Sequence, residues 1–372
     1  MLIGALGIRL VLWVGPTIPL PAPAGVMKAL TEVTVTNDSE GQDGFQLTLT
    51  LGKDALGDFG VLSSGTFDPL RRVVIGVLMG ASPEVLIDGV VTHHQVVPSG
   101  EPGMSTMTVT GKDLTQVMDL DERNVDYPNQ PDFVIFTRLI ATYPQYGLVP
   151  TPTPTTDVPI MLQRVPRQHE TDLQFIRRLA ERNGFVFYVE PVGPGVNKAY
   201  FGPEARIGAP QPALTQGLGP ATNVRSLHFS NDALAPVGTR GTFVDPIFKL
   251  SIPIPSLPSL RLPPLSRGPA PAYRTVQLRD TANENPARAA TAAAAAVTRA
   301  PEPIEGSGEL DAARYGSVLR ARRLVGVRGA GTTFDGFYWV KQVTHTIKTG
   351  SYTQGFKLSR EGTGALLPVV AP

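Results

Sequence analysis

The sequence predicts a mainly β protein with a mixed α+β region in its middle. Glycine and proline are frequent, at 38 and 36 of the 372 residues, while 42% of the residues are hydrophobic. This composition indicates a globular chain with many turns. Short segments near both ends alternate polar and apolar residues, which is typical of half-buried antiparallel strands. Between them, a helical pattern leads directly into an aromatic strand.

The first third of the chain consists of predicted strands and turns. Residues 31–36 and 45–51 alternate with period two, and the polar loop 37–44 joins them. Further strands are expected at residues 8–14, 72–79, 83–92 and 105–110, with a turn at 88–89 and a loop at 98–103. Several short strands at close spacing favour a sandwich or a barrel.

Two helices are predicted in the middle of the chain. Asp132 is placed to cap the first, and Pro144 ends it. The apolar face of this helix consists of Phe133, Phe136, Leu139 and Ile140. Thr171 and Gln174 form a capping box for the second helix, and Gly184 follows where a left-handed C-cap is expected. Residues 185–189 then continue as an aromatic strand, which completes an α+β unit.

Two proline-rich segments interrupt these patterns. Residues 149–159 contain the run Pro-Thr-Pro-Thr-Pro, which predicts an extended linker. Residues 251–271 contain seven prolines. They cannot form a central strand, because proline donates no ladder hydrogen bond. We expect an extended loop or arm there.

The last quarter of the chain returns to strands after one helix. Asn285 is expected to cap this helix, with Pro286 at its first position. Strands are then predicted at 317–327, 336–345 and 352–359. The patterns divide the chain into a first β domain (1–112), a mixed α+β domain (113–205), a connecting region with the proline-rich arm (206–274) and a second β domain (275–372).

The net charge, the lack of cysteine and the composition of the N-terminal residues argue against several classes of protein. The net charge is only +1, whereas a nucleic-acid-binding protein usually has a marked basic excess. The chain has no cysteine, which excludes disulfides and thiolate metal sites. Residues 1–14 are apolar apart from Arg9, but a membrane span needs about 20 apolar residues. We expect no membrane insertion and no nucleic-acid specificity.

The sequence lacks the usual signatures of an active site. The histidines are His93, His94, His169, His228 and His345, all expected in loops or at the surface. His93 and His94 are neighbours on a predicted strand, so they point to opposite faces. Neither Gly193–Gly195 nor Gly329–Gly331 continues into a dinucleotide-binding fingerprint, and Gly306–Gly308 lacks the spacing of a nucleophile elbow. We therefore predict no catalytic, cofactor-binding or metal-binding residue, and no enzymatic activity.

One basic cluster remains without an assigned role. It consists of Arg314, Arg320, Arg322, Arg323 and Arg328. On a strand, Arg320 and Arg322 would share a face. The cluster forms either a solvated face or a contact with acidic partner subunits or anionic cargo, since basic patches attract negative partners.

Three motifs give the chain a resemblance to a known family. Residues 168–188 read QHETDLQFIRRLAERNGFVFY. Residues 334–345 read FDGFYWVKQVTH, followed by GSY at 350–352 and FKLSR at 356–360. Residues 18–23 read IPLPAP and precede VTVTN at 33–37. In this order, the motifs resemble the phage late control protein D family, which contains tail hubs and the hub portion of VgrG proteins.

The resemblance implies a structural role and a fold. It implies two tube-protein-like antiparallel β-barrels with a helix-containing domain inserted between them. Three copies would then present six barrels and adapt a threefold spike to a sixfold inner tube. The implied partners are two further copies, a separate spike protein, inner tube subunits and other baseplate proteins. The implied location is a phage tail or injection particle, assembled in the cytoplasm.

Two alternatives compete with this interpretation. A β-rich binding module at the tail tip would expose aromatic residues in loops, but the aromatics here lie mostly in strand patterns. A tail-associated cell-wall hydrolase would need an additional catalytic domain, and residues 206–275 are too poor in pattern to form one. The proline-rich segment 251–271 is not part of the motif set, and we expect the spike to be a separate protein.

Overall fold

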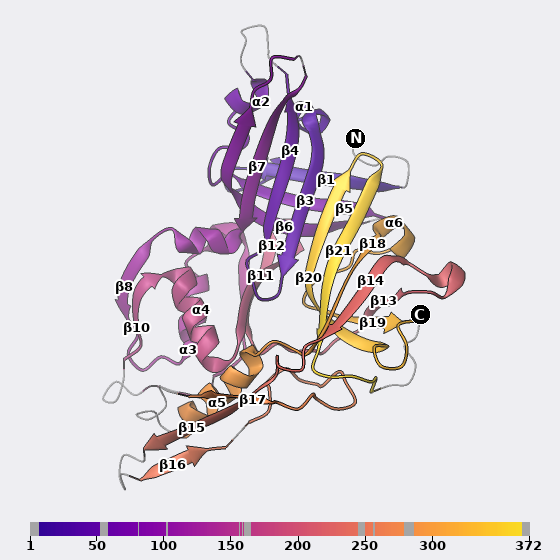
Figure 1. The fold of residues 1–372 in the computed structure, drawn as a ribbon. Coiled ribbons are helices and arrows are strands. Elements are labelled where there is room, and N and C mark those ends of the chain that lie inside the picture. Colours follow the sequence, from indigo (N-terminus) through magenta and orange to yellow (C-terminus); the bar gives the residue numbers. More distant parts are fainter. Residues whose placement is uncertain are drawn as a thin grey trace.

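The computed structural model describes residues 7–52, 59–80, 82–101, 103–155, 157, 159, 165–244, 250–255, 257–278 and 286–366. Its main feature is a 13-stranded sheet in which the hydrogen-bonded order is β14-β18-β21-β20-β3-β4-β7-β6-β5-β1-β2, with β19 and β13 attached beside β20. This architecture confirms the prediction of a mainly β protein (Figure 1). No helix among the described residues is long and apolar enough to cross a membrane.

The first β region contains seven strands. They are β1 (Ile8–Gly15), β2 (Leu20–Pro21), β3 (Leu30–Asp38), β4 (Gly44–Leu51), β5 (Arg72–Met79), β6 (Ser82–Val97) and β7 (Ser105–Asp113), with the short helices α1 (Ala24–Ala29) and α2 (Gly60–Ser63). Figure 1 shows β1 and β5 running across the direction of β3, β4 and β7, behind them in this view. Phe45, Leu47 and Leu49 alternate inward along β4 and join inward residues of β1 and β5 in one core.

The predicted turn at 88–89 is wrong, because β6 continues through it. Asp88 is buried and forms an ion pair with Arg72, which allows an acidic residue inside the sheet. Gly89 is required by close packing, since a Cβ atom there would lie 2.1 Å from the Lys112 carbonyl oxygen. The Asp-Gly pair therefore marks a tight strand contact here and not a hairpin.

The second β region contains six strands. They are β13 (Gln211–Thr215), β14 (Val224–Asn231), β18 (Ile304–Asp311), β19 (Leu324–Arg328), β20 (Gly336–Lys348) and β21 (Ser351–Arg360), with α6 (Ala312–Tyr315). The prediction of a strand over 317–327 is partly wrong, because β19 begins only at Leu324. Arg322 has φ of 61°, a left-handed conformation that does not fit a strand ladder.

The two β regions share one sheet through the antiparallel pair β3–β20. The register runs from Asp38 opposite Gln342 to Glu32 opposite Lys348. An ion pair of 3.2 Å between Lys348 and Glu32 lies at one end of the pair. Strand hydrogen bonds therefore connect segments that are about 300 positions apart in the chain.

The middle region packs two helices against short sheets. It contains β8 (Glu122–Asp126), α3 (Asp132–Ile140), β9 (Leu148–Pro152), β10 (Arg167–Thr171), α4 (Asp172–Asn183), β11 (Val186–Gly193) and β12 (Val196–Gly202), and the 3-10 helices η1 (Leu114–Asp119) and η2 (Pro144–Tyr146). The Thr171 N-cap and the Gly184 C-cap of α4 are confirmed, because the Thr171 hydroxyl accepts from the Gln174 amide and Gly184 is left-handed. The predicted capping box is only half formed, since the Gln174 side chain donates to Asp119. Asp132 does not cap α3; it lies in the first turn, where its carboxylate binds Arg182 and Asn183.

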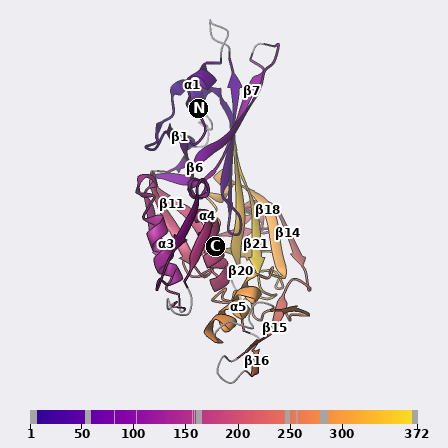
Figure 2. The ribbon, with the colours of Figure 1, turned by 90° about the vertical axis from the view of Figure 1, so that its left-hand side faces the viewer.

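An arm extends from the second β region. It contains β15 (Val237–Val244), β16 (Ser251–Ile254) and β17 (Arg274–Gln277), ordered β16-β15-β17, and packs on α5 (Pro286–Arg299). Figure 2 shows the first β region at one end of an elongated molecule and this arm at the other. Pro253 lies on β16, an edge strand, where proline is tolerated. Pro286 begins α5 as predicted, and Asn285 lies outside the described residues.

The buried face of α4 provides the first test of the fold. Leu179 is fully buried in the middle core, so Leu179→Ala is expected to lower the free energy of unfolding by about 2–5 kcal/mol. Chemical denaturation of purified protein measures this change. Arg177→Ala, on the exposed face of the same helix, is the matched control. Equal stabilities of the two variants would contradict the packing described for this helix.

Candidate functional site

The first β region, the second β region and the middle region meet at a junction that contains buried arginines. Arg72, Arg206 and Arg322 are 3%, 1% and 8% exposed, and each one faces carboxylates. A buried charge is tolerated only when it is paired and hydrogen-bonded. Together, the three clusters hold the parts of the chain against one another.

Arg322 connects all three parts. Its Nη2 lies 2.6 Å from Asp43 Oδ1 and its Nη1 lies 3.0 Å from Asp43 Oδ2, a two-pronged contact with the first β region. Its guanidinium carbon lies 4.5 Å from the ring centre of Tyr188, which belongs to the middle region. Asn37 also donates to Asp43, at 3.0 Å. Arg322 lies two residues before β19, has a left-handed backbone with φ of 61°, and is buried.

Arg320 makes a second contact between the β regions. Its guanidinium donates to the Val85 carbonyl and to Glu84, both at 2.5 Å. The prediction that Arg320 and Arg322 share a strand face is wrong, since both precede β19. Neither arginine is left for a solvated face or an external partner, because each binds the first β region. The hypothesis of an anion-binding patch therefore fails at these two positions.

The other arginines of the predicted basic cluster are dispersed. Arg314 is exposed, Arg323 forms an ion pair with Glu190 at 3.2 Å, and Arg328 donates to the Thr215 hydroxyl. Five arginines that are close in the sequence thus point to different neighbours, and they form no single patch.

A second cluster joins the first β region to the middle region. Arg72 binds Asp88 through two hydrogen bonds of 2.8 and 2.6 Å. Asn197, on β12, donates to the same carboxylate at 2.8 Å. Arg72 also donates to the Tyr146 carbonyl at 3.0 Å, so a single guanidinium contacts both regions.

The third cluster surrounds Arg206. Its guanidinium lies 2.8 Å from Glu204, 2.8 Å from Glu302 and 3.1 Å from Glu361. Burial alone would raise the pKa of Glu302, but the charges of Arg206 and Arg261 hold it below its usual value. The ion pairs of Arg206 connect the loop after β12 to Glu302 and to Glu361, which follows β21.

Asp113 next to the Arg322 cluster has a perturbed pKa. Burial, and then the negative charge of Asp43, raise it from 3.8 to about 6. The side chain accepts from the amide of Thr115 at 3.0 Å and so caps η1.

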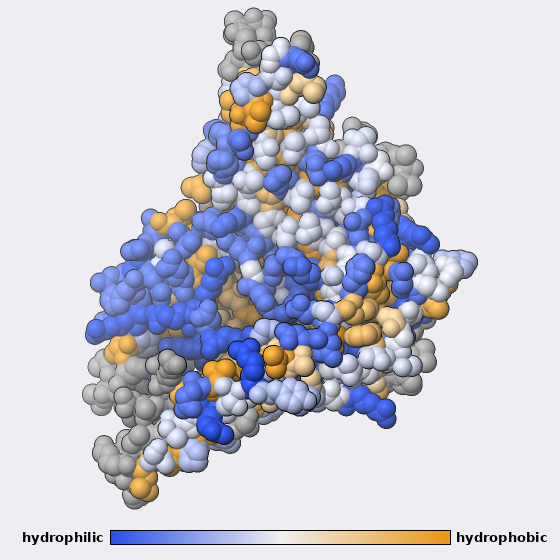
Figure 3. Space-filling model, viewed as in Figure 1, coloured by the Kyte–Doolittle hydropathy of each residue, from blue (hydrophilic) through white to orange (hydrophobic). Residues whose placement is uncertain are grey.

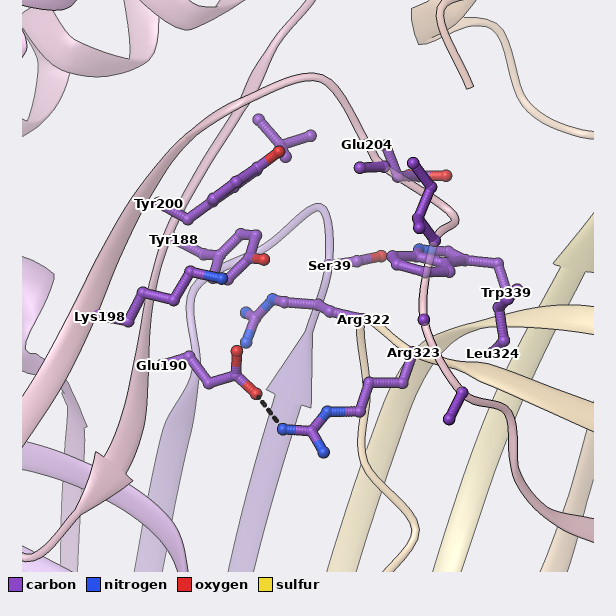
Figure 4. Close-up of a pocket in the computed structure, with 15 residues that line it drawn as sticks. Ser39, Tyr188, Glu190, Lys198, Tyr200, Glu204, Arg322, Arg323, Leu324 and Trp339 are labelled. Carbon is purple, nitrogen blue, oxygen red and sulfur yellow. Dashed lines mark hydrogen bonds and ion pairs between the residues drawn. The ribbon is translucent and has the colours of Figure 1, made fainter. Parts of the chain in front are cut away.

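A cavity of about 460 Å³ opens beside Arg322 (Figure 4). Figure 4 shows Tyr188, Glu190 and Lys198 on one side of it and Trp339 on the other. The indole nitrogen of Trp339 and the hydroxyl of Ser39 are buried here without a protein hydrogen-bond partner. The cavity therefore has room and donors for ordered water. Among its charged groups, Arg323 pairs with Glu190, Arg322 pairs with Asp43, and the Lys198 ammonium lies 4.8 Å from the ring centre of Tyr200.

The histidine predictions are correct for three positions and wrong for one. His93, His169 and His228 are exposed, and His94 is half-buried. His345 is fully buried, with its Nδ1 2.9 Å from the Tyr352 hydroxyl. Burial, and then the charge of Arg320, lower its pKa to about 3. Within the described part of the chain, no three His, Asp or Glu residues are placed to hold a metal ion.

Comparisons with known proteins identify the fold. No family model and no curated protein matches the sequence. The tail protein from Neisseria meningitidis MC58 is similar with a TM-score of 0.63 and 13% identity, over 96% of this chain and 98% of that chain. The 43 kDa tail protein of prophage MuSo2 from Shewanella oneidensis is similar with a TM-score of 0.62 and 14% identity, over 95% and 98%. The E. coli c3393 protein, a component of the type VI secretion system, is similar with a TM-score of 0.53 and 13% identity, over 92% and 77%.

The chain thus has the fold of phage tail proteins over nearly its whole length. The two tail proteins cover 96% and 95% of the chain. The residues that the sequence analysis did not single out are Asp43, Asp88, Arg72 and Arg206. Asp43 lies in a loop that was interpreted as a simple polar turn, and Asp88 in a predicted turn. The burial of His345 could have been predicted, because it lies on the same strand face as the apolar residues Val343 and Ile347.

Substitutions at two adjacent arginines test the buried pair. Arg322→Met leaves Asp43 charged, buried and without its counter-ion, so it is expected to lower stability by about 3–5 kcal/mol. Arg323→Met removes an exposed ion pair and is expected to cost less than about 1 kcal/mol. Urea denaturation of both variants measures the difference. Equal effects would show that the Arg322–Asp43 pair does not hold the junction.

The raised pKa of Asp113 predicts a pH effect of definite sign. The folded state keeps this proton up to about pH 6, whereas the unfolded chain releases it near 3.8, so the stability contributed by Asp113 falls as the pH rises through this window. Between pH 4 and 7, the free energy of unfolding of the wild type is expected to fall by on the order of 2 kcal/mol relative to that of Asp113→Asn. Parallel stability curves for the two proteins would contradict the assignment.

Proposed function

We propose that the chain is a structural subunit of the central baseplate hub in a contractile phage tail or contractile injection system, where it joins the central spike to the inner tube. The observation that supports this most strongly is the similarity of the whole chain to phage tail proteins and to a type VI secretion component. The hub assignment also draws on the order of the three sequence motifs. We propose no catalytic, cofactor or metal role.

The construction of the junction suits a part that transmits force. A continuous sheet through β3–β20 and three buried ion-pair clusters fix the two β regions and the middle region relative to one another. Buried charge pairs are costly to separate, because each leaves an uncompensated charge. Such a subunit can carry the load of tail contraction as one unit.

The presence of two β regions in one chain suits an adaptor between symmetries. Three copies in a ring would present six β regions, which matches a sixfold tube above and a threefold spike below. The strand path of the described residues ends at β14 and at β2, so each copy offers free sheet edges. Long unpaired edges must be covered. A head-to-tail contact that closes after three copies would cover them.

The proposed partners are two further copies, a separate spike protein, inner tube subunits and other baseplate proteins. Assembly in the cytoplasm would precede incorporation into the particle. The domain division at 112, 205 and 274 remains our proposal, with the β3–β20 pair as the contact between the first and last units.

The stoichiometry of the complex with the spike tests this function. The chain is co-expressed with a spike protein from the same particle, and the mass of the purified complex is measured by mass photometry. We expect three copies of this chain per spike trimer. Two or six copies, or no association with the spike, would contradict the proposed hub.

A further inference from the structure

We propose that the arm of one copy docks onto an acidic strand of the next copy in the ring. The arm comprises the described residues of 233–278, with β15, β16 and β17. The acidic strand comprises residues 119–126, with β8. This inference depends on the proposed ring of three copies and names the surfaces that would close it.

The arm has an uncovered surface within a single copy. All four residues of β17 are exposed, and so are the first three residues of β16. Large apolar side chains are among the exposed residues, with Tyr273 at 70%, Val276 at 39% and Ile252 at 38%. In the described part of the chain β17 pairs on one side only, with β15. A strand with both faces and one edge free gains little stability from its own chain.

The base of the arm adds an apolar groove. Its volume is about 440 Å³, and its lining includes Leu257, Pro258, Pro264, Val297 and Pro301. Proline-lined walls are stiff, so the groove keeps its shape without an occupant. A contiguous apolar surface of this kind is typical of a protein interface.

The arm is basic. Arg240, Arg267 and Arg274 are exposed, and the described residues of the arm include no acidic residue. Arg240 and Arg274 lie on the paired strands β15 and β17, so both belong to one small sheet. The fourth arginine, Arg261, turns inward to Glu204 and Glu40. The exposed Arg240, Arg267 and Arg274 therefore give the outer surface of the arm its positive charge.

The acidic strand has the opposite charge. Residues 119–126 contain Asp119, Asp121, Glu122 and Asp126 against one basic residue. That residue, Arg123, lies 3.2 Å from the buried Asp172, so part of its charge is directed inward. Asp121 and Glu122 are exposed, and the neighbouring Leu120 is 48% exposed. Figure 3 shows a broad hydrophilic surface on this side of the molecule.

The acidic strand also offers a free edge. Among the described strands β8 pairs with β10 alone, so one of its edges has unpaired backbone groups. Figure 1 shows β8 well separated from β16 at the tip of the arm. The two complementary surfaces thus lie at different places on one chain. Contact between them joins different copies head to tail, which is the arrangement that a closed ring requires.

Charge reversal and rescue test the docking. Arg240→Glu with Arg274→Glu reverses the charge of the arm. Asp121→Lys with Glu122→Lys reverses the charge of the acidic strand. All four positions are exposed, so the variants are expected to fold. Each reversal should weaken assembly of three copies on the spike by at least about tenfold, because like charges would then face each other. A chain with all four changes should recover most of the loss.

Two controls separate the possible outcomes. Arg177→Glu with Arg314→Glu makes the same change of charge at exposed positions elsewhere and should leave assembly unchanged. Three copies on the spike that are insensitive to both reversals would overturn the docking and leave the hub proposal intact. A wild-type chain that never binds the spike would refute the hub.

If the chain does not bind the spike, cross-linking of the free chain still tests whether the arm of one copy contacts the acidic strand of another. The chain has no cysteine, so Arg274→Cys and Glu122→Cys copies with different tags can be mixed and treated with a bismaleimide. A mixed product supports the contact. No mixed product at high protein concentration would overturn the contact. A control pair with Arg314→Cys in place of Arg274→Cys that gives the same yield would also overturn it.

Discussion

The ion pair between Arg322 and Asp43 is the interaction on which the arrangement of the protein depends most. It joins residues 279 positions apart: Arg322 lies just before β19 of the second β region, and Asp43 lies between β3 and β4 of the first. The same guanidinium lies over Tyr188 of the middle region. Because an unpaired buried charge costs several kcal/mol, the three parts are stable only in the arrangement that keeps this pair intact.

The strand pair β3–β20 and the other two clusters reinforce this arrangement. Strand pairing fixes the direction and register of the two β regions, while Arg72 and Arg206 attach the middle region and the loop after β12. Backbone ladders and buried ion pairs both have strict geometry, so together they favour one orientation over many. This rigidity is the physical basis for proposing a load-bearing adaptor.

Much of the fold could be predicted from local patterns. The alternation at 31–36 and 45–51 and the Thr171 and Gly184 signals of α4 all correspond to observed elements, because local periodicity and capping depend on nearby residues. The junction could not be predicted in this way. The pairing of Arg322 with Asp43, and the continuation of β6 through Asp88, depend on partners far away in the sequence.

The central claim is that the chain occupies the position between spike and tube, and its most direct test is a cryo-electron microscopy reconstruction of the intact particle. We expect three copies of this fold around the particle axis, with β3 and β20 paired as here and the spike and the first tube ring on opposite faces. Density for this chain at the periphery of the baseplate, or a copy number other than three at the axis, would contradict the account.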